Sequence, residues 1–288
     1  MAAKLDLHST LKMKSGYSIP VLGYGVYQTP AAVAHDVTHH AILSGYRHVD
    51  SATVYRNEAP SAAGMLATPV PRDQLFYTSK VEPRNLSYAG AKASVAATLQ
   101  QTGLGYIDLY LLHAPYGGRE ARLGAWRALV ESVAEGKVRS IGVSNYGVHH
   151  LEELEQWQKQ QPTPQAAGIL SINQIELHPW LARPDIVTWC RARSIHLEAY
   201  SPLVRSTKMS DPLLLPLAAK HGKTPAQILL RWGLQQGFVV LPKSVTHARI
   251  EQNADIFDFE LDEGDMRGLE TGVYEPCTWN PTTAPLSE

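Results

Sequence analysis

The sequence predicts an α/β fold, namely a single (β/α)8 TIM barrel over residues 1–288 that begins with a short N-terminal β-hairpin. Short β-type runs recur along the chain with helical patterns between them, and no linker interrupts the alternation. The runs are spaced by 26 to 43 residues, which is enough for one strand, one helix and two loops. They begin near Val21, Arg47, Leu75, Tyr106, Val138, Ile169, Ile195 and Phe238.

The first elements of this barrel have clear local signals. Ser15-Gly16 is a turn signal between residues 11–14 and 17–20, which predicts the hairpin. After the third barrel strand, Ser87 is suited to cap a helix from its N-terminal side. The apolar face of that helix consists of Ala91, Val95 and Leu99.

A second helix follows the fourth strand, and Gly136 ends it. Its apolar stripe consists of Leu123, Trp126, Val130 and Val133. The strands on either side, residues 109–112 and 138–143, are apolar almost throughout. Strands of this kind are typical of parallel sheets that helices cover on the outside.

The alternative fold is an open, doubly wound sheet, which should carry a glycine-rich fingerprint in its first strand-to-helix turn. Gly23 and Gly25 supply the first two glycines, but Gln28 stands where the third belongs. Between Gly142 and Gly147 the spacing is also one residue too long for the nucleophile elbow of a hydrolase. The missing fingerprint favours the closed barrel over the open sheet, and the missing elbow argues against a hydrolase.

Composition excludes several classes of protein. Lys and Arg total 26 and Asp and Glu total 27, so the basic excess of a nucleic-acid-binding protein is missing. Cys190 and Cys277 lie far apart and outside any CxxC motif, and His35 and His39 lack the pattern of a zinc helix, so we expect no metal site. No apolar run reaches membrane-spanning length. We expect a cytoplasmic protein without nucleic-acid or membrane partners; its oligomeric state stays open, and a monomer is compatible with the sequence.

Ionisable residues gather after the second, third and fourth strands. Asp50, Lys80 and His113 each end a predicted strand, and Tyr55 follows Asp50 in the same loop. The carboxyl ends of barrel strands share one face, and active sites of barrels are built on that face. The four side chains therefore converge either as a catalytic group or as a structural Asp50–Lys80 ion pair with two neighbours.

Three stretches resemble signatures of the aldo-keto reductases, in family order and across nearly the whole chain. They are residues 45–58 (GYRHVDSATVYRNE), residues 129–146 (ending IGVSNY) and residues 241–253 (LPKSVTHARIEQN). Residues 105–113 (GYIDLYLLH) are similar to the family's fourth-strand motif. The resemblance implies a (β/α)8 barrel that reduces carbonyl compounds with NADPH.

The resemblance also implies roles for the four ionisable residues. Tyr55 would donate the proton to the carbonyl oxygen, and a cationic Lys80 would lower the pKa of that phenol. Asp50 would keep Lys80 charged and correctly oriented. His113 would hydrogen-bond the substrate oxygen and orient the carbonyl.

Cofactor contacts are implied in the same way. Ser144, Asn145 and Gln174 would hold the nicotinamide carboxamide, and Tyr200 would stack on the ring. Lys243, Ser244 and Arg249 would surround the adenosine 2′-phosphate of NADPH or NADP+. The remaining cofactor positions are Gly25, Val26, Asp50, Ser201, Leu203, Val245, Gln252 and Asn253.

Two departures from the family pattern concern the ligand sites. Val26 stands where many relatives have a hydroxyl residue, so one hydrogen bond to the cofactor is absent. Ala114 stands where a tryptophan commonly follows the histidine, which predicts open space beside the carbonyl. With Tyr27, Tyr116 and Trp279, Ala114 forms the predicted substrate pocket, whose rings favour aromatic or apolar carbonyl compounds.

The leading functional hypothesis is therefore an NADPH-dependent oxidoreductase that reduces aldehydes or ketones to alcohols. One alternative is a cofactor-binding barrel that serves mainly as a regulatory or interaction subunit. Another is a reductase whose true substrates are sugars.

Overall fold

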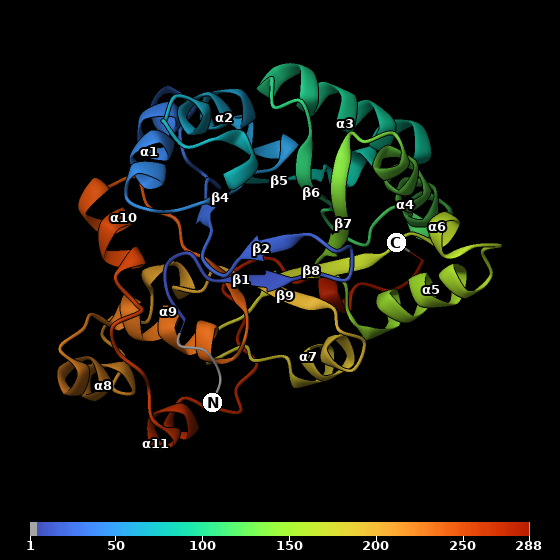
Figure 1. The fold of residues 1–288 in the computed structure, drawn as a ribbon. Helices are drawn as coiled ribbons and strands as arrows, with labels where there is room; N and C mark the ends of the chain where they lie inside the picture. Colours follow the sequence, from blue (N-terminus) through green and yellow to red (C-terminus); the bar gives the residue numbers. More distant parts are fainter. Residues whose placement is uncertain (1–4, 288) are drawn as a thin grey trace.

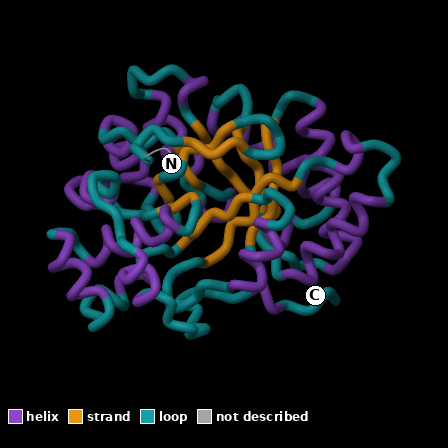
Figure 2. Tube along the Cα trace, turned by 60° about the horizontal axis from the view of Figure 1, so that its bottom comes forward, coloured by secondary structure: helices purple, strands orange, loops and turns teal. Residues whose placement is uncertain are grey.

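In a computed structural model, which describes residues 5–287, parallel strands form an inner ring and helices pack around it (Figures 1 and 2). The strands are β1 (Thr10–Lys12), β2 (Ser18–Pro20), β3 (Tyr24–Gly25), β4 (His48–Asp50), β5 (Phe76–Val81), β6 (Ile107–Leu112), β7 (Val138–Ser144), β8 (Leu170–Glu176), β9 (His196–Tyr200) and β10 (Val239–Leu241). The order within the large sheet is sequential from β3 to β10, with every pairing parallel.

Helices follow the barrel strands along the chain. They are α1 (Ala31–Leu43), α2 (Glu58–Leu66), α3 (Tyr88–Thr102), α4 (Gly118–Ala134), α5 (Val148–Lys159), α6 (Pro164–Ala167), α7 (Pro184–Arg191), α8 (Leu214–His221), α9 (Pro225–Gln235), α10 (His247–Ala254) and α11 (Glu263–Gly268). Short 3-10 turns are η1 (Thr53–Tyr55), η2 (Arg72–Gln74), η3 (Pro83–Asn85), η4 (Val204–Ser206) and η5 (Pro281–Thr283). Within residues 5–287, no helix is both long and apolar enough to cross a membrane.

The first and last barrel strands meet beside β3. Leu22 forms a parallel bridge to Val240, and the Gly23 amide donates to the Val240 carbonyl at 2.9 Å. This contact brings the ends of the sheet together into a barrel. The predicted (β/α)8 fold is therefore confirmed, and most strands begin within a residue or two of their predicted starts; β3 begins later, at Tyr24.

The predicted hairpin is present as β1 and β2, and it lies across the opening at the amino-terminal ends of the barrel strands (Figure 1). Its Met13 and Ile19 are buried against barrel residues such as Phe76 and Leu109. At the turn, Gly16 has a φ of +91°, which glycine adopts without steric cost. The hairpin thus closes one end of the barrel with apolar side chains and leaves the other end for the polar residues.

Local signals explain the two helices that the sequence predicts best. Ser87 caps α3, because its Oγ accepts a hydrogen bond from the Gly90 amide at 2.9 Å. In α4, Trp126 and Leu123 are buried against the barrel, whereas Val133 is exposed in the last turn. Val133 is therefore a member of the predicted apolar stripe that is exposed to solvent.

Candidate active site

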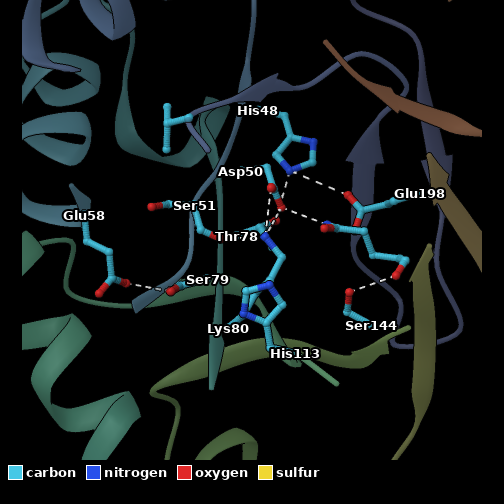
Figure 3. Close-up of polar contacts among 12 residues, drawn as sticks. His48, Asp50, Ser51, Glu58, Thr78, Ser79, Lys80, His113, Ser144 and Glu198 are labelled. Atoms are coloured by element: carbon cyan, nitrogen blue, oxygen red, sulfur yellow. Dashed lines mark hydrogen bonds and ion pairs between the residues drawn. The ribbon is translucent and has the colours of Figure 1, made fainter. Parts of the chain in front are cut away.

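Three strands bring the predicted catalytic residues to the carboxyl end of the barrel. Asp50 is the last residue of β4, Lys80 lies next to the end of β5, and His113 directly follows β6. Tyr55 ends η1 in the loop after β4. Figure 3 shows Asp50, Lys80 and His113 converging from these neighbouring strands. The parallel register therefore produces the convergence that the strand-end pattern predicts.

Lys80 is the centre of this group, and its side chain is completely buried. Its ammonium donates to both carboxylate oxygens of Asp50, at 2.8 and 2.9 Å, and to the Ser51 carbonyl at 2.7 Å. All three N–H donors of the ammonium are thus used. These hydrogen bonds hold the end of the lysine side chain in one orientation.

Tyr55 lies over this ion pair. The Lys80 ammonium is 5.1 Å from the centre of the Tyr55 ring, and the Tyr27 ring centre is 5.0 Å away on another side. The pKa of Tyr55 is raised well above 10, mainly by loss of surrounding water, with further contributions from Asp50 and Tyr27. The predicted lowering of this pKa by Lys80 is therefore wrong, because burial and the negative charge of Asp50 both raise the pKa. Tyr55 is a protonated phenol at neutral pH.

His113 faces Tyr55 with 5.8 Å between ring centres. Burial lowers the pKa of His113 well below 6.5, and the nearby charge of Lys80 lowers it further. Its Nδ1 atom has no hydrogen-bond partner among residues 5–287. A neutral imidazole with an unpartnered nitrogen is suited to hydrogen-bond a small ligand beside Tyr55.

The residues expected at the nicotinamide lie at the ends of β7, β8 and β9 and form one network. Tyr200 Oη donates to Asn145 Oδ1 at 2.7 Å, and Asn145 Nδ2 donates to the His113 carbonyl at 3.0 Å. Ser144 Oγ donates to the Gln174 carbonyl at 2.8 Å. Asn145 adopts a left-handed backbone with φ of +63°, a strained conformation that is concentrated at functional sites. Stacking of Tyr200 on a nicotinamide stays a prediction.

The residues expected at the 2′-phosphate lie around the start of α10. Lys243 and Arg249 are exposed, and in the part of the chain that the structure describes neither side chain makes a hydrogen bond or an ion pair. Ser244 is buried, and its carbonyl accepts a hydrogen bond from Tyr24 Oη at 2.6 Å. Two unneutralised cations beside a helix N-terminus form a favourable environment for a phosphate.

The other predicted cofactor positions occupy the same end of the barrel. Gly25 and Val26 follow one another at the end of β3, where the Gly25 amide donates to the Pro242 carbonyl and the Val26 amide to the Asp50 carbonyl. Ser201 directly follows β9 with a φ of +48°. Further positions are Leu203 before η4, Val245 before α10, and Gln252 and Asn253 within α10.

Aromatic side chains surround the opening above Tyr55. The Trp279 ring lies edge-on to His113 at 5.9 Å and to Tyr116 at 6.0 Å. Tyr27 and Trp279 are exposed, whereas Ala114 has no exposed surface. The predicted open space at Ala114 is therefore absent, because neighbouring atoms cover this side chain completely.

The C-terminal tail is held by buried polar residues that the sequence analysis missed. The Arg183 guanidinium donates to Tyr274 Oη at 2.9 Å, to Asn280 Oδ1 at 2.8 Å and to Thr282 Oγ1. Arg183 itself has a left-handed backbone conformation. A buried arginine with this many partners fixes the segment on both sides of Trp279.

Glu176, the last residue of β8, also holds the C-terminal tail. Its carboxylate accepts from His178 Nε2 at 2.9 Å, from the Cys277 amide at 2.6 Å and from Thr278 Oγ1. Ligand atoms of Glu176, His178 and Cys277 lie within 4.8 Å of one another. Burial, together with Glu176, raises the pKa of the Cys277 thiol to about 12, which disfavours the thiolate that a metal would need. The group therefore serves as the attachment of the tail.

Two further polar residues inside the barrel, His48 and Glu198, were also missed. Both are completely buried, and Figure 3 shows them close to Asp50. The available signal was the presence of ionisable residues inside predicted buried strands, at Arg47–Asp50 and Ile195–Tyr200. Burying such groups is costly without a partner, so each of them calls for a structural or functional reason.

The chain as a whole is similar to known sequences and structures. A model of the Aldo/keto reductase family matches residues 22–271. An uncharacterized oxidoreductase of Schizosaccharomyces pombe is 40% identical over 285 residues, covering 97% of this chain and all of the relative. Glyoxal reductase of Bacillus subtilis is 40% identical over 266 residues, covering 92% and 93%. The crystal structure of an aldo/keto reductase from Brucella melitensis superposes with a TM-score of 0.84 at 36% identity, covering 91% of this chain and 98% of that one.

Proposed function

Because the chain belongs to the aldo/keto reductase family, and so is an oxidoreductase, we propose that it reduces aldehydes or ketones to alcohols with NADPH, with Tyr55 as the proton donor. The observation that carries this proposal is the fully buried Asp50–Lys80 pair, whose ammonium lies 5.1 Å from the Tyr55 ring centre. A charged lysine beneath a protonated phenol is the arrangement that general acid catalysis by tyrosine requires.

The donor set of the site fits a nicotinamide dinucleotide phosphate. Lys243 and Arg249 would hold the 2′-phosphate, and Ser144, Asn145 and Gln174 would hold the carboxamide. When bound, the cofactor supplies the hydride that reduces the carbonyl carbon.

The chain's own residues would supply orientation and the proton. His113, neutral at pH 7, would hydrogen-bond the carbonyl oxygen and hold it against the Tyr55 hydroxyl. Tyr55 would then donate its proton to that oxygen as negative charge develops there. Lys80 would stabilise the resulting tyrosinate, whose formation burial and Asp50 oppose.

The proposed activity is tested by loss of NADPH absorbance with a panel of aldehydes, ketones and aldoses. Glyoxal belongs in the panel because a relative with 40% identity bears the name glyoxal reductase. We expect turnover with aldehydes or ketones. Tight NADPH binding with almost no turnover across the panel would instead favour a regulatory or interaction subunit.

Arg249→Ala is expected to weaken NADPH binding by roughly 10- to 150-fold and NADH binding little, since one charge-assisted contact contributes about 1.5–3 kcal/mol. Dissociation constants for both cofactors, measured by quenching of protein fluorescence, check this. Arg267→Ala is the matched control, because Arg267 is an exposed cation on α11 that pairs with Glu263. Equal weakening of NADPH and NADH would contradict a 2′-phosphate role for Arg249.

We further propose that aromatic or other apolar carbonyl compounds are preferred over sugars. Tyr27, Tyr116 and Trp279 present ring surfaces at the opening, where the hydroxyl groups of an aldose would lose water without gaining partners. The wild type should therefore have a higher kcat/KM for a substituted benzaldehyde than for xylose.

Trp279→Ala should lower kcat/KM for the benzaldehyde by about 10-fold or more while changing that for a small aliphatic aldehyde little, because it removes apolar contact area. Tyr17→Ala is the control, since Tyr17 is an exposed ring in the hairpin at the opposite end of the barrel. A wild type that prefers xylose would refute the proposed substrate class.

A further inference from the structure

Two buried carboxyl groups share one amide inside the barrel. Gln174 Nε2 donates to Asp50 Oδ2 at 2.8 Å and to Glu198 Oε2 at 3.0 Å. An amide nitrogen carries two N–H donors, so both are used and Gln174 keeps only its oxygen as an acceptor. Gln174 thereby connects Glu198 on β9 directly to the Asp50–Lys80 pair on β4 and β5.

Only one of these two carboxyl groups has a cationic partner. Lys80 uses two of its donors on Asp50 and the third on a backbone carbonyl, so it has none for Glu198. Glu198 Oε1 has no hydrogen-bond partner among the described residues. An ionised Glu198 would therefore be a second, uncompensated negative charge in the barrel interior.

His48 does not compensate that charge. Its Nε2 atom lies 3.8 Å from Glu198 Oε1, beyond hydrogen-bond distance, and instead pairs with Thr78 Oγ1 at 2.9 Å. Its other nitrogen faces Gly23, where a Cβ would lie only 2.6 Å away. Burial and the charge of Lys80 lower the pKa of His48 to about 3, so the ring is neutral.

The groups that face Glu198 are thus His48 and Asp50 from β4, Thr78 and Lys80 from β5, and Gln174 from β8. On the β10 side, the register partner of Glu198 is the apolar Val239. Burial is the largest cause that raises the pKa of Glu198, to about 8, and the charge of Asp50 adds to it. Glu198 therefore carries a proton at neutral pH.

We propose that Glu198 is a proton-binding residue whose ionisation is coupled to the oxidation state of the bound nicotinamide. This inference rests on the proposed function, in which Gln174 would hold the nicotinamide carboxamide, and on the predicted stacking of Tyr200 on the nicotinamide ring. Gln174 hydrogen-bonds Glu198, and Tyr200 lies two residues further along the same strand. The oxidised ring is cationic and the reduced ring is neutral, so only the oxidised ring stabilises a nearby carboxylate.

The coupling is a balanced binding equilibrium. Protonated Glu198 and NADP+ give a complex of ionised Glu198 with NADP+ and one proton released to solvent, whereas NADPH binding leaves the proton on Glu198. Below the pH at which free Glu198 ionises, release of NADP+ is therefore favoured, because Glu198 regains its proton. The residue would act on product release without contacting the reacting atoms.

The test measures Kd for NADP+ and NADPH from pH 6 to 9 by protein fluorescence. The ratio of the two constants cancels titration of the 2′-phosphate, which both cofactors share. Between the two pKa values of Glu198 in the free and NADP+-bound protein, the ratio Kd(NADP+)/Kd(NADPH) should fall about tenfold per pH unit. Calorimetry near neutral pH in two buffers of different ionisation enthalpy should detect more proton release with NADP+ than with NADPH, because the 2′-phosphate contributes equally to both.

Glu198→Gln keeps the length of the side chain and removes the ionisation, so the pH dependence of the ratio and the additional proton release with NADP+ should both disappear. Glu58→Gln is the matched control. Glu58 is also buried and its pKa is also raised by burial, but its carboxyl bonds Ser79 and Thr98 rather than Gln174 (Figure 3). This control should keep the wild-type dependence.

Infrared difference spectra of the wild type give a measurement that needs no variant. The C=O band of a protonated carboxyl group should be lost when NADP+ binds and kept when NADPH binds. A ratio that stays constant with pH while both cofactors bind would overturn the coupling and leave the proposed function intact. Unchanged pH dependence in Glu198→Gln would overturn the assignment to Glu198, and failure to bind either cofactor would overturn both proposals.

Discussion

Tyr55→Phe is expected to lower kcat by about 10²- to 10⁴-fold, the range over which a positioned general acid contributes to catalysis. The substitution removes only the hydroxyl, while the ring keeps its contacts with Tyr27 and His113. Binding of NADPH should therefore stay within about twofold of the wild type, on the scale of a fraction of a kcal/mol. Steady-state kinetics and a fluorescence titration measure the two quantities separately.

Tyr27→Phe is the matched control for this experiment. Tyr27 is the neighbouring phenol, with ring centres 5.0 Å apart, but it is exposed, whereas the Lys80 ammonium lies over the ring of Tyr55. Loss of the Tyr27 hydroxyl should change kcat by less than about threefold, as expected for a group that takes no part in proton transfer. If Tyr55→Phe retained wild-type kcat, the proton would have to come from another group, and the central part of the proposed mechanism would be wrong.

Lys80→Met is expected to lower both activity and stability. Without the ammonium, the tyrosinate formed at Tyr55 loses its cationic neighbour, and kcat should fall by about 10²-fold or more. Asp50 would also remain as a buried carboxylate without a cation, which costs about 3–5 kcal/mol of folding free energy. Thermal unfolding followed by circular dichroism measures the second effect.

A double variant separates the two consequences. Asp50→Asn combined with Lys80→Met removes both charges, so much of the lost thermal stability should return while kcat stays low. Lys92→Met, at an exposed ion pair with Glu135, should change the folding free energy by only about 0.5 kcal/mol. Full recovery of kcat in the double variant would show that Lys80 acts only by neutralising Asp50.

The sequence alone was sufficient for the architecture and for the convergence of Asp50, Lys80 and His113. Strand runs near Arg47, Leu75 and Tyr106 begin one residue before β4, β5 and β6. Once the strands are parallel and neighbours in order, residues that end them must lie on one face. This conclusion depends on periodicity and order along the chain, both of which are local properties that a single sequence contains.

The tertiary structure decided pKa shifts, burial and buried hydrogen bonds, because these properties depend on how many groups surround a side chain and at what distance. The direction of the Tyr55 pKa shift follows from burial and from Asp50, whose effects oppose that of Lys80. Ala114 has no exposed surface, and Arg183 fixes the tail that carries Trp279, neither of which is visible in the sequence. The connection of Glu198 to Asp50 through Gln174 joins β9, β8 and β4 across the barrel interior. These contacts link residues up to 124 positions apart. Their electrostatic effects change steeply with distance and with exclusion of water, so only packing in three dimensions determines them.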